Sequence, residues 1–159
     1  MYALRTLIEH DVRLVVIGGY AGNLLGSPIM TGDTGICYQR DRANCDRLAA
    51  ALRDLDARPR DGLGLPFVLD GHTIYNGCNF TFATTAGDLD CLCEPGATFR
   101  YEDLLPNARE TYVEDIAVLV ASVEDLIRMK RFAGRPKDMW AIEILAGLQQ
   151  EIDRQGDPE

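Results

Sequence analysis

The spacing of apolar residues in the N-terminal part of the chain switches from a helical to a strand-like pattern. Leu4, Leu7 and Ile8 share one helical face, which predicts a short helix over residues 2–10. The run RLVVIGG, residues 13–19, is apolar and largely β-branched up to two glycines, as is typical of a buried strand. The chain is therefore expected to begin with a helix, followed by a strand that ends in a glycine turn.

The next segments continue this alternation. YAGNLLG, residues 20–26, predicts a short helix that Gly26 and Pro28 end, and DTGICYQ, residues 33–39, predicts a strand. Asn44 is a favourable N-cap for a further helix, because its side chain can accept a bond from a free backbone amide. The buried stripe of that helix is expected to consist of Cys45, Leu48, Ala51, Leu52 and Leu55.

The middle of the chain has the pattern of strands joined by turns. RPRDGLG is typical of a surface loop, and the segments LPFVLD, CNFTFAT and DLDCLCE each predict a strand. The AGD sequence between the last two is a plausible hairpin turn.

The remaining third predicts one hairpin and two helices. The hairpin folds at Glu114 and Asp115, and Ser122 caps a helix that Gly134 closes. Pro136 opens the last helix, which carries an apolar stripe. Elements in this order predict a mixed sheet with helices packed on it, in the α/β or α+β class.

Composition limits the classes of protein to consider. The 159 residues suffice for one domain with a hydrophobic core, and 47% of them are apolar, as in a folded globular protein. The formal net charge of −9 argues against a general nucleic-acid-binding protein, which needs a basic face. A local basic cluster between Arg128 and Lys137 remains compatible with binding a phosphate group.

The five cysteines favour an intracellular setting. Their odd number and the absence of a CxxC spacing are unfavourable for a disulfide framework or a zinc site. We therefore expect buried thiols, no disulfides and a reducing, cytoplasmic location. The N-terminal sequence lacks the pattern of a signal peptide, and no apolar run is long enough to span a membrane, so no membrane partner is expected.

Three groups of residues could carry chemistry. The first is Gly18 and Gly19, at a strand-to-helix turn where backbone amides can approach a phosphate. Glycine at such a turn is about as often required only for its backbone conformation. The pair is part of neither a Walker A loop nor a complete GxGxxG motif.

The second group is acidic. Asp88 and Asp90 share one face of a predicted strand, and Asp33 would share a face with residue 35, which is Gly35. Carboxylates at adjacent strand ends are suitable ligands for Mg²⁺, and two such ions can act in phosphoryl transfer. Taken singly, each aspartate is more often a turn residue that bonds its own backbone.

The third group is the basic segment LIRMKRFAGRPKDMW. A lysine on a helix beside an acidic site could bind a triphosphate as a point charge. By pattern alone, a solvated basic face near a helix C-terminus is the more frequent explanation.

Together these groups resemble the minimal nucleotidyltransferase-like proteins of the DNA polymerase β superfamily. That family has a Gly-Gly or Gly-Ser turn, an Asp-x-Asp motif on a strand and a third carboxylate on a later strand. Gly18 and Gly19 match the turn, Asp33 the first carboxylate and Asp90 the third. The segment SVEDLIRMKRFAGRPKDMWAIEIL resembles a subgroup that includes abortive-infection toxins of the AbiEii type and many bacterial relatives.

The resemblance implies a fold, an activity and site residues. It implies one nucleotidyltransferase-like domain over residues 1–155, a mixed sheet flanked by helices with a helical C-terminus, and a frayed tail at 156–159. The implied activity is metal-dependent transfer of a nucleoside monophosphate from an NTP to a hydroxyl of an RNA, protein or small-molecule acceptor, with Mg²⁺ as cofactor. The implied residues are Gly18 and Gly19 for phosphate, Asp33 and Asp90 for catalysis and metal, Asp88 as a substitute metal ligand, and Lys130 for the triphosphate with Lys137 and Arg135 behind it.

The chain departs from the family pattern at two positions. Gly35 stands where the second carboxylate of Asp-x-Asp is expected, and Ala141 stands where the subgroup has an aspartate. The sequence therefore supports two functional hypotheses. One is an active nucleotidyltransferase, and the other is a catalytically impaired nucleotide-binding or regulatory protein, such as one member of a toxin–antitoxin pair.

Overall fold

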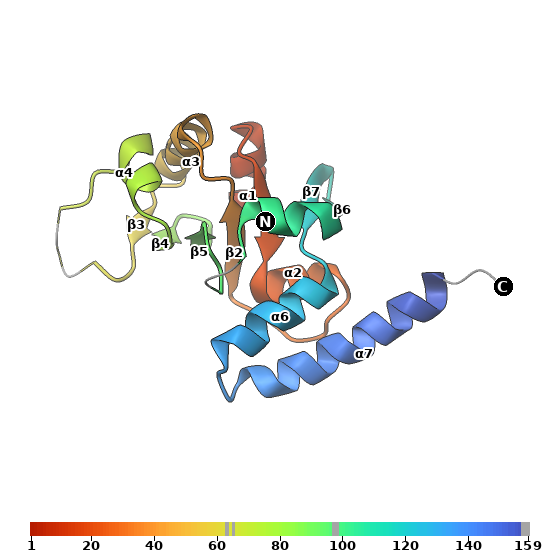
Figure 1. Ribbon diagram of the computed structural model, residues 1–159. Helices are drawn as coiled ribbons and strands as arrows, with labels where there is room; N and C mark the ends of the chain where they lie inside the picture. Colours follow the sequence, from red (N-terminus) through yellow and green to blue (C-terminus); the bar gives the residue numbers. More distant parts are fainter. Residues whose placement is uncertain (63, 65, 97–98, 157–159) are drawn as a thin grey trace.

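A seven-stranded mixed sheet forms the centre of the structure (Figure 1). The computed structural model describes residues 1–62, 64, 66–96 and 99–156. The strand order is β3-β4-β5-β2-β1-β7-β6, with β2 parallel to β5 and β1 parallel to β7. The strands are β1 Leu14–Ile17, β2 Asp33–Tyr38, β3 Arg58–Pro59, β4 Phe80–Thr84, β5 Gly87–Leu92, β6 Arg109–Val113 and β7 Ile116–Val120.

Helices cover the sheet in two groups, which Figure 1 shows on opposite sides of it. The helix α3 packs on α1 and α4, and α6 packs on α7 and α2. The helices are α1 Tyr2–Glu9, α2 Gly18–Leu24, α3 Arg42–Asp54, α4 Gly71–Asn76, α5 Tyr101–Leu104, α6 Val123–Ala133 and α7 Asp138–Gly156, with a 3₁₀ turn η1 at Leu105–Asn107. The prediction of a mixed sheet with helices packed on it is confirmed.

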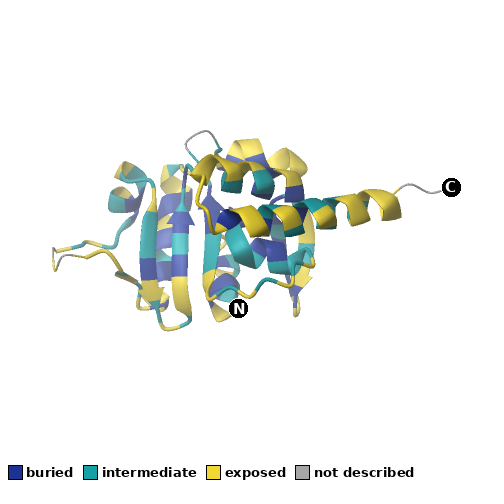
Figure 2. Ribbon diagram, turned by 90° about the horizontal axis from the view of Figure 1, so that it is seen from below, coloured by how far each residue is buried: buried dark blue, intermediate teal, exposed yellow. Residues whose placement is uncertain are grey.

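The core lies along the central strands, which carry dark-blue buried segments in Figure 2. All four residues of β1 are buried, because β2 and β7 flank the strand and helices cover it. This burial accounts for the uninterrupted apolar run in the sequence. The distal part of α7 extends past the sheet in both views and is largely exposed.

Several predicted boundaries are correct because local side-chain bonds set them. The Ser122 hydroxyl accepts a hydrogen bond from the Asp125 amide at the start of α6, and Gly134 ends that helix with a φ of +62°. The β6–β7 hairpin turns at Glu114 and Asp115, as predicted. The helix α7 ends at Gly156, the first residue of the expected tail, and residues 157–159 lie outside the described residues.

The prediction of Asn44 as a helix cap is wrong. The cap of α3 is Asp41, whose side chain accepts a hydrogen bond of 2.8 Å from the Asn44 amide. The buried Asn44 side chain accepts a bond from the Arg13 amide and donates to the carbonyls of Arg13 and Gln39. It therefore links the entrance of β1 to the exit of β2, which is a long-range role that local spacing does not reveal.

The segment between α3 and β4 also differs from the prediction. LPFVLD contains no strand among its described residues, and α4 follows it, capped by the Asp70 side chain that accepts a bond from the Thr73 amide. The edge strand β3 lies instead in RPRDGLG, which was predicted as a loop. A proline is tolerated in β3 because an edge strand leaves some amides unpaired.

The prediction of no disulfides is wrong. Cys78 and Cys93 form a disulfide, with their Cα atoms 5.1 Å apart, and it joins the segment before β4 to the end of β5. An odd cysteine count does not exclude one bonded pair, and here Cys37, Cys45 and Cys91 remain as buried free thiols. Separately, none of the described helices is both long and apolar enough to cross a membrane.

Candidate functional site

The parallel pairing of β2 with β5 places the acidic residues side by side. Asp33 pairs with Asp88, and Gly35 pairs with Asp90. Because side chains alternate across a strand, these four positions share one face of the sheet. The fold thus brings together the aspartates that the sequence separates by more than fifty positions.

We call Asp33, Asp88 and Asp90 the acidic row. Gly35 lies beside this row on β2, between the neighbouring strands β5 and β1. It pairs with Asp90 on β5 and with Ile17 on β1. A Cβ atom at position 35 would lie 3.3 Å from the Ile17 carbonyl oxygen and 3.4 Å from Ile17 Cγ1. A side chain at this position therefore needs the neighbouring strand to shift by a few tenths of an ångström.

Arg60 contacts the acidic row, and the sequence did not predict it as a site residue. Its guanidinium forms ion pairs with Asp88, at 2.9 Å between Nη1 and Oδ2, and with Asp90. Its amide donates to the Thr81 carbonyl at 3.0 Å, which fixes the backbone just after β3. Nothing in the local sequence could have paired Arg60 with Asp88, because 28 positions separate them.

The pKa values of Asp90 and Arg60 are both raised at this site. The pKa of Asp90 is raised above its ordinary value, mainly by burial, with the charges of Asp33 and Asp88 adding to the effect and Arg60 opposing it. The pKa of Arg60 is raised further, chiefly by its hydrogen bond to Asp88. The Asp90 side chain is 27% exposed, which agrees with burial as the leading cause.

A cleft of about 270 Å³ opens between this part of the sheet and α6. Gly18, Gly35 and Asp90 line it on the sheet side, and Lys130 and Arg135 line it near the end of α6. Gly18 has a φ of +72°, and no atom lies within 4 Å of the position its Cβ would take. This backbone conformation favours glycine, and the absence of a side chain at position 18 leaves the cleft open at this point.

The two basic residues of the cleft are held by Asp138 at the start of α7. The Arg135 Nε donates to Asp138 Oδ2 at 2.7 Å, and Lys130 Nζ lies 3.8 Å from Asp138 Oδ1. The Asp138 side chain is 5% exposed and that of Lys130 is 18% exposed. The buried carboxylate thus fixes two cations at the cleft wall opposite Asp90.

The remaining predicted site residues lie around the cleft and do not line it. Asp33 and Asp88 belong to the acidic row farther along the same face. Gly19 follows Gly18 in α2, where an added Cβ would come within 3.0 Å of Thr31. Lys137 is exposed in the α6–α7 connection and contributes no cleft wall.

The residues present do not form a site for a resident metal ion. Within the described ranges, no group of three or more His, Cys, Asp and Glu side chains is arranged to hold one. The row has a glycine where a carboxylate would complete it, and Arg60 already forms ion pairs with both Asp88 and Asp90. The donor set therefore does not fit the two-metal arrangement that the sequence resemblance implies.

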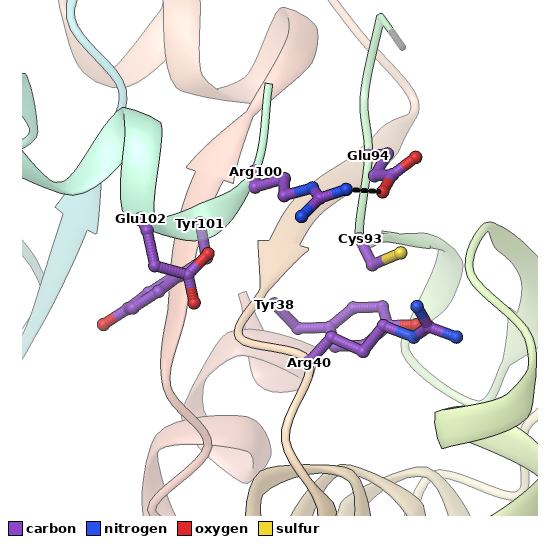
Figure 3. Close-up of a pocket in the computed structure, with 7 residues that line it drawn as sticks. All are labelled: Tyr38, Arg40, Cys93, Glu94, Arg100, Tyr101 and Glu102. Carbon is purple, nitrogen blue, oxygen red and sulfur yellow. Dashed lines mark ion pairs between the residues drawn. The ribbon is translucent and has the colours of Figure 1, made fainter. Parts of the chain in front are cut away.

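A second cavity of about 240 Å³ lies at the far ends of β2 and β5 (Figure 3). Its lining includes the disulfide residue Cys93 and two arginines. Arg100 is paired with Glu94 at 2.9 Å, and the Arg40 Nε donates to the Tyr75 carbonyl. Because the carboxylates of Glu94 and Glu102 also line this cavity and no predicted site residue lies here, it is the weaker candidate for binding a phosphate.

Comparison with known proteins supports the fold. No family model matches the chain, and no curated protein matches it. Solved structures do match. The antibiotic-resistance factor ANT(2'')-Ia in solution has a TM-score of 0.61 and 17% identity, covering 94% of this chain and 80% of that one.

Two further solved structures agree with this match. The crystal structure of ANT(2'')-Ia in complex with adenylyl-2''-tobramycin has a TM-score of 0.61 and 16% identity, covering 94% of this chain and 85% of that one. A candidate nucleotidyltransferase from Thermotoga maritima has a TM-score of 0.57 and 14% identity, covering 95% and 91%. At these identities the likeness establishes a nucleotidyltransferase-like fold.

Proposed function

We propose that this chain binds a nucleoside triphosphate in the cleft between the sheet and α6. The observation that carries the proposal is the convergence of Gly18, Lys130 and Arg135 on one cleft, in a fold shared with nucleotidyltransferases. Two cations at one wall supply positive charge for phosphate oxygens, and a glycine at the other wall lets a ligand approach the backbone.

The size of the cleft limits how the nucleotide would lie. Its volume of about 270 Å³ is slightly below the ~300–1,000 Å³ typical of complete ligand pockets. The phosphates would occupy the charged part beside Lys130 and Arg135. The nucleoside would extend along the apolar wall, which Leu126 and Met129 of α6 form.

Calorimetric titration with each of the four common NTPs tests the proposal. The key variant is Lys130→Gln, and the matched control is Lys137→Gln, which removes the same charge outside the cleft. We expect Lys130→Gln to weaken binding about tenfold or more, since a charge-assisted hydrogen bond contributes about 1.5–3 kcal/mol. Absence of binding to the unchanged chain, or equal losses in both variants, would contradict the proposal.

Nucleotidyl transfer to a hydroxyl acceptor is a second candidate function. One observation favours it, namely that Asp33, Asp88 and Asp90 project from adjacent strands on a single face. ANT(2'')-Ia, a protein of similar fold, has been solved with a nucleotidylated small molecule, so a small-molecule hydroxyl is a suitable first acceptor to test. The hydroxyl would attack the α-phosphate, the bond from the α-phosphorus to the bridging oxygen would break, and pyrophosphate would leave. Asp90, beside the cleft, would accept the proton from the attacking hydroxyl.

Transfer of label from α-labelled NTP separates the two functions. Label that appears on an acceptor with the unchanged chain, and is lost in Asp90→Asn, supports transfer. Binding without transfer is instead the behaviour of a regulatory nucleotide-binding protein, including one member of a toxin–antitoxin pair. Gly35→Asp provides the comparison, because label transferred only by that variant would locate the defect at position 35.

A further inference from the structure

We propose that Arg60 is a built-in counterion of the acidic row, occupying the position between Asp88 and Asp90 where a divalent cation would otherwise bind. A metal ion can then enter this row only if the guanidinium leaves. The inference goes beyond nucleotide binding, because it concerns the binding of metal by the protein alone.

The position of Arg60 is set by the sheet edge. The strand β3 pairs with β4 through Arg58–Ala83 and Pro59–Phe82, and the next amide, that of Arg60, donates to Thr81. The following residue, Asp61, accepts a 2.8 Å hydrogen bond from the Thr81 hydroxyl. Backbone pairing thus holds the chain up to Arg60, and the Asp61 side chain holds it just after, so the Arg60 side chain emerges beside the row.

The contacts of the guanidinium match a bridging role. Separate nitrogens, Nη1 and Nη2, pair with the two aspartates, and the Arg60 side chain is only 27% exposed. Thr81 pairs with Asp90 across β4 and β5, which brings the anchor and the carboxylate to the same level of the sheet. A guanidinium held in this way satisfies one oxygen of each carboxylate with a directed bond.

Charge makes Arg60 and a metal ion mutually exclusive. The carboxylates of Asp33, Asp88 and Asp90 carry up to three negative charges, and Arg60 removes one. A divalent cation placed between the same two carboxylates would lie within a few ångströms of the guanidinium, where repulsion in a partly buried setting is strong. Gly35 contributes no compensating charge.

Binding of Mn²⁺ alone, measured by calorimetry and electron paramagnetic resonance, tests the proposal. The test variant is Arg60→Gln. The matched control is Arg58→Gln, which removes an equal charge two residues earlier in the chain. The Arg58 side chain is 78% exposed, and within the described ranges its ion-pair partner is Asp56, at 3.5 Å. We expect Arg60→Gln to bind Mn²⁺ at least about tenfold more tightly than the unchanged chain, and Arg58→Gln to bind as the unchanged chain does.

Two results would overturn the proposal. The first is equal Mn²⁺ affinity in Arg60→Gln and the unchanged chain. The second is a gain in affinity that survives when Asp88→Asn and Asp90→Asn are added to Arg60→Gln, because the metal would then bind elsewhere. A purely structural role for Arg60 predicts lower stability without any gain in metal affinity, so it is distinguished by the same titration.

A measurement on the unchanged chain covers the case in which Arg60→Gln does not fold. The Arg60 side-chain signals in a nuclear magnetic resonance spectrum should keep their chemical shifts as Mg²⁺ is added, because the guanidinium stays on the two carboxylates. Progressive shifts of the Arg60 and Asp90 signals at low Mg²⁺ would contradict the proposal. Both tests are made without nucleotide, so their outcome is independent of whether the cleft binds NTP.

Discussion

Gly35 and Asp90 lie directly opposite each other on the parallel strands β2 and β5, at the edge of the cleft that also contains Lys130 and Arg135. The pairing identifies position 35 as the place where a second carboxylate would face the cleft. No carboxylate stands at position 35, and among the described residues the ion-pair partner of Asp90 is Arg60. The electrostatic balance of the row therefore depends on two residues, the glycine and the arginine.

Gly35→Asp should make nucleotide binding dependent on Mg²⁺. The new carboxylate adds a negative charge beside Asp90 and provides a further oxygen ligand for Mg²⁺. We expect Mg²⁺ to change NTP affinity by less than about twofold in the unchanged chain and to increase it about tenfold or more in the variant. Calorimetric titration with and without Mg²⁺ measures this difference.

Gly35→Ala is the control for the space that any side chain occupies. Its Cβ would lie 3.3 Å from the Ile17 carbonyl oxygen, so a loss of stability of up to about 1 kcal/mol is expected from packing. Metal dependence in Gly35→Ala equal to that in Gly35→Asp would show that the carboxylate is not the cause.

The two glycines after β1 should respond differently to substitution. Gly19→Ala places a Cβ 3.0 Å from Thr31, which should lower the free energy of unfolding. Adding Thr31→Gly should restore it, because the close contact is then removed. Gly18→Ala meets no neighbour within 4 Å but imposes a φ of +72°, which costs about 1–2 kcal/mol and cannot be relieved by truncating a side chain. Urea unfolding of both variants, each with and without Thr31→Gly, measures this; rescue of Gly18→Ala would contradict it.

Local signals predicted much of the fold. The buried strand β1, the Ser122 cap, the Gly134 end of α6 and the Glu114–Asp115 turn all depend on neighbouring residues, so their patterns are visible in sequence. The mixed α/β class follows from the order of such elements. The sequence also named Gly18, Asp90 and Lys130, which the structure places along one cleft.

Features that depend on contacts between distant segments were not predictable. Arg60 reaches Asp88 and Asp90 only because β4 lies between β3 and β5 in the sheet. The disulfide forms because the same strand order brings Cys78 beside Cys93. Whether the number of cysteines is odd or even carries no information about this proximity. The short helix α4 was missed because its cap, Asp70, lies at the end of an apolar run that favours a strand.

Asp138→Asn should destabilise the junction of α6 with α7. The Asp138 side chain is 5% exposed and accepts hydrogen bonds from Arg135, so the variant loses a charged partner for two cations. We expect a loss of about 1–3 kcal/mol in unfolding free energy and weaker NTP binding, because Arg135 loses its orientation. Glu143→Gln, at an exposed position of α7, is the control. Equal stability of the two variants in urea would contradict the prediction.

The buried thiols should make the fold less stable at alkaline pH. Burial raises the pKa of Cys37 to about 12 and of Cys45 to about 11, and it raises the pKa of Cys91 as well. Since these pKa values are higher in the folded than in the unfolded chain, their contribution is complete below pH ~9 and is lost as pH rises above it. At about pH 10 the loss is about 1 kcal/mol for each thiol.

Urea unfolding at pH 8 and pH 10 measures this dependence. Cys37→Ala should lose less stability between the two pH values than the unchanged chain, because one titrating group is removed. The same slope in both proteins would show that other groups, such as Tyr38, whose pKa is also raised, control the alkaline transition.

The disulfide between Cys78 and Cys93 should be visible in the pattern of cysteine alkylation. In the native protein at about pH 8, the three free thiols are buried, and the pKa of Cys45 at about 11 lowers its thiolate fraction about a hundredfold relative to an ordinary thiol. We therefore expect almost no alkylation of the native protein without reductant. Unfolding should expose three thiols, and unfolding with reduction should expose all five.

Loss of this bond should also lower stability. The two half-cystines are 15 residues apart, and closing a loop of that size stabilises a folded chain by about 3 kcal/mol. Cys78→Ser with Cys93→Ser should therefore unfold at lower urea than the unchanged oxidised protein, and should match the unchanged protein after reduction. Five alkylated thiols in the unreduced, unfolded protein would contradict the presence of the bond. Equal stability of oxidised and reduced protein would show that the sheet alone positions the end of β5, where Leu92 lines the cleft.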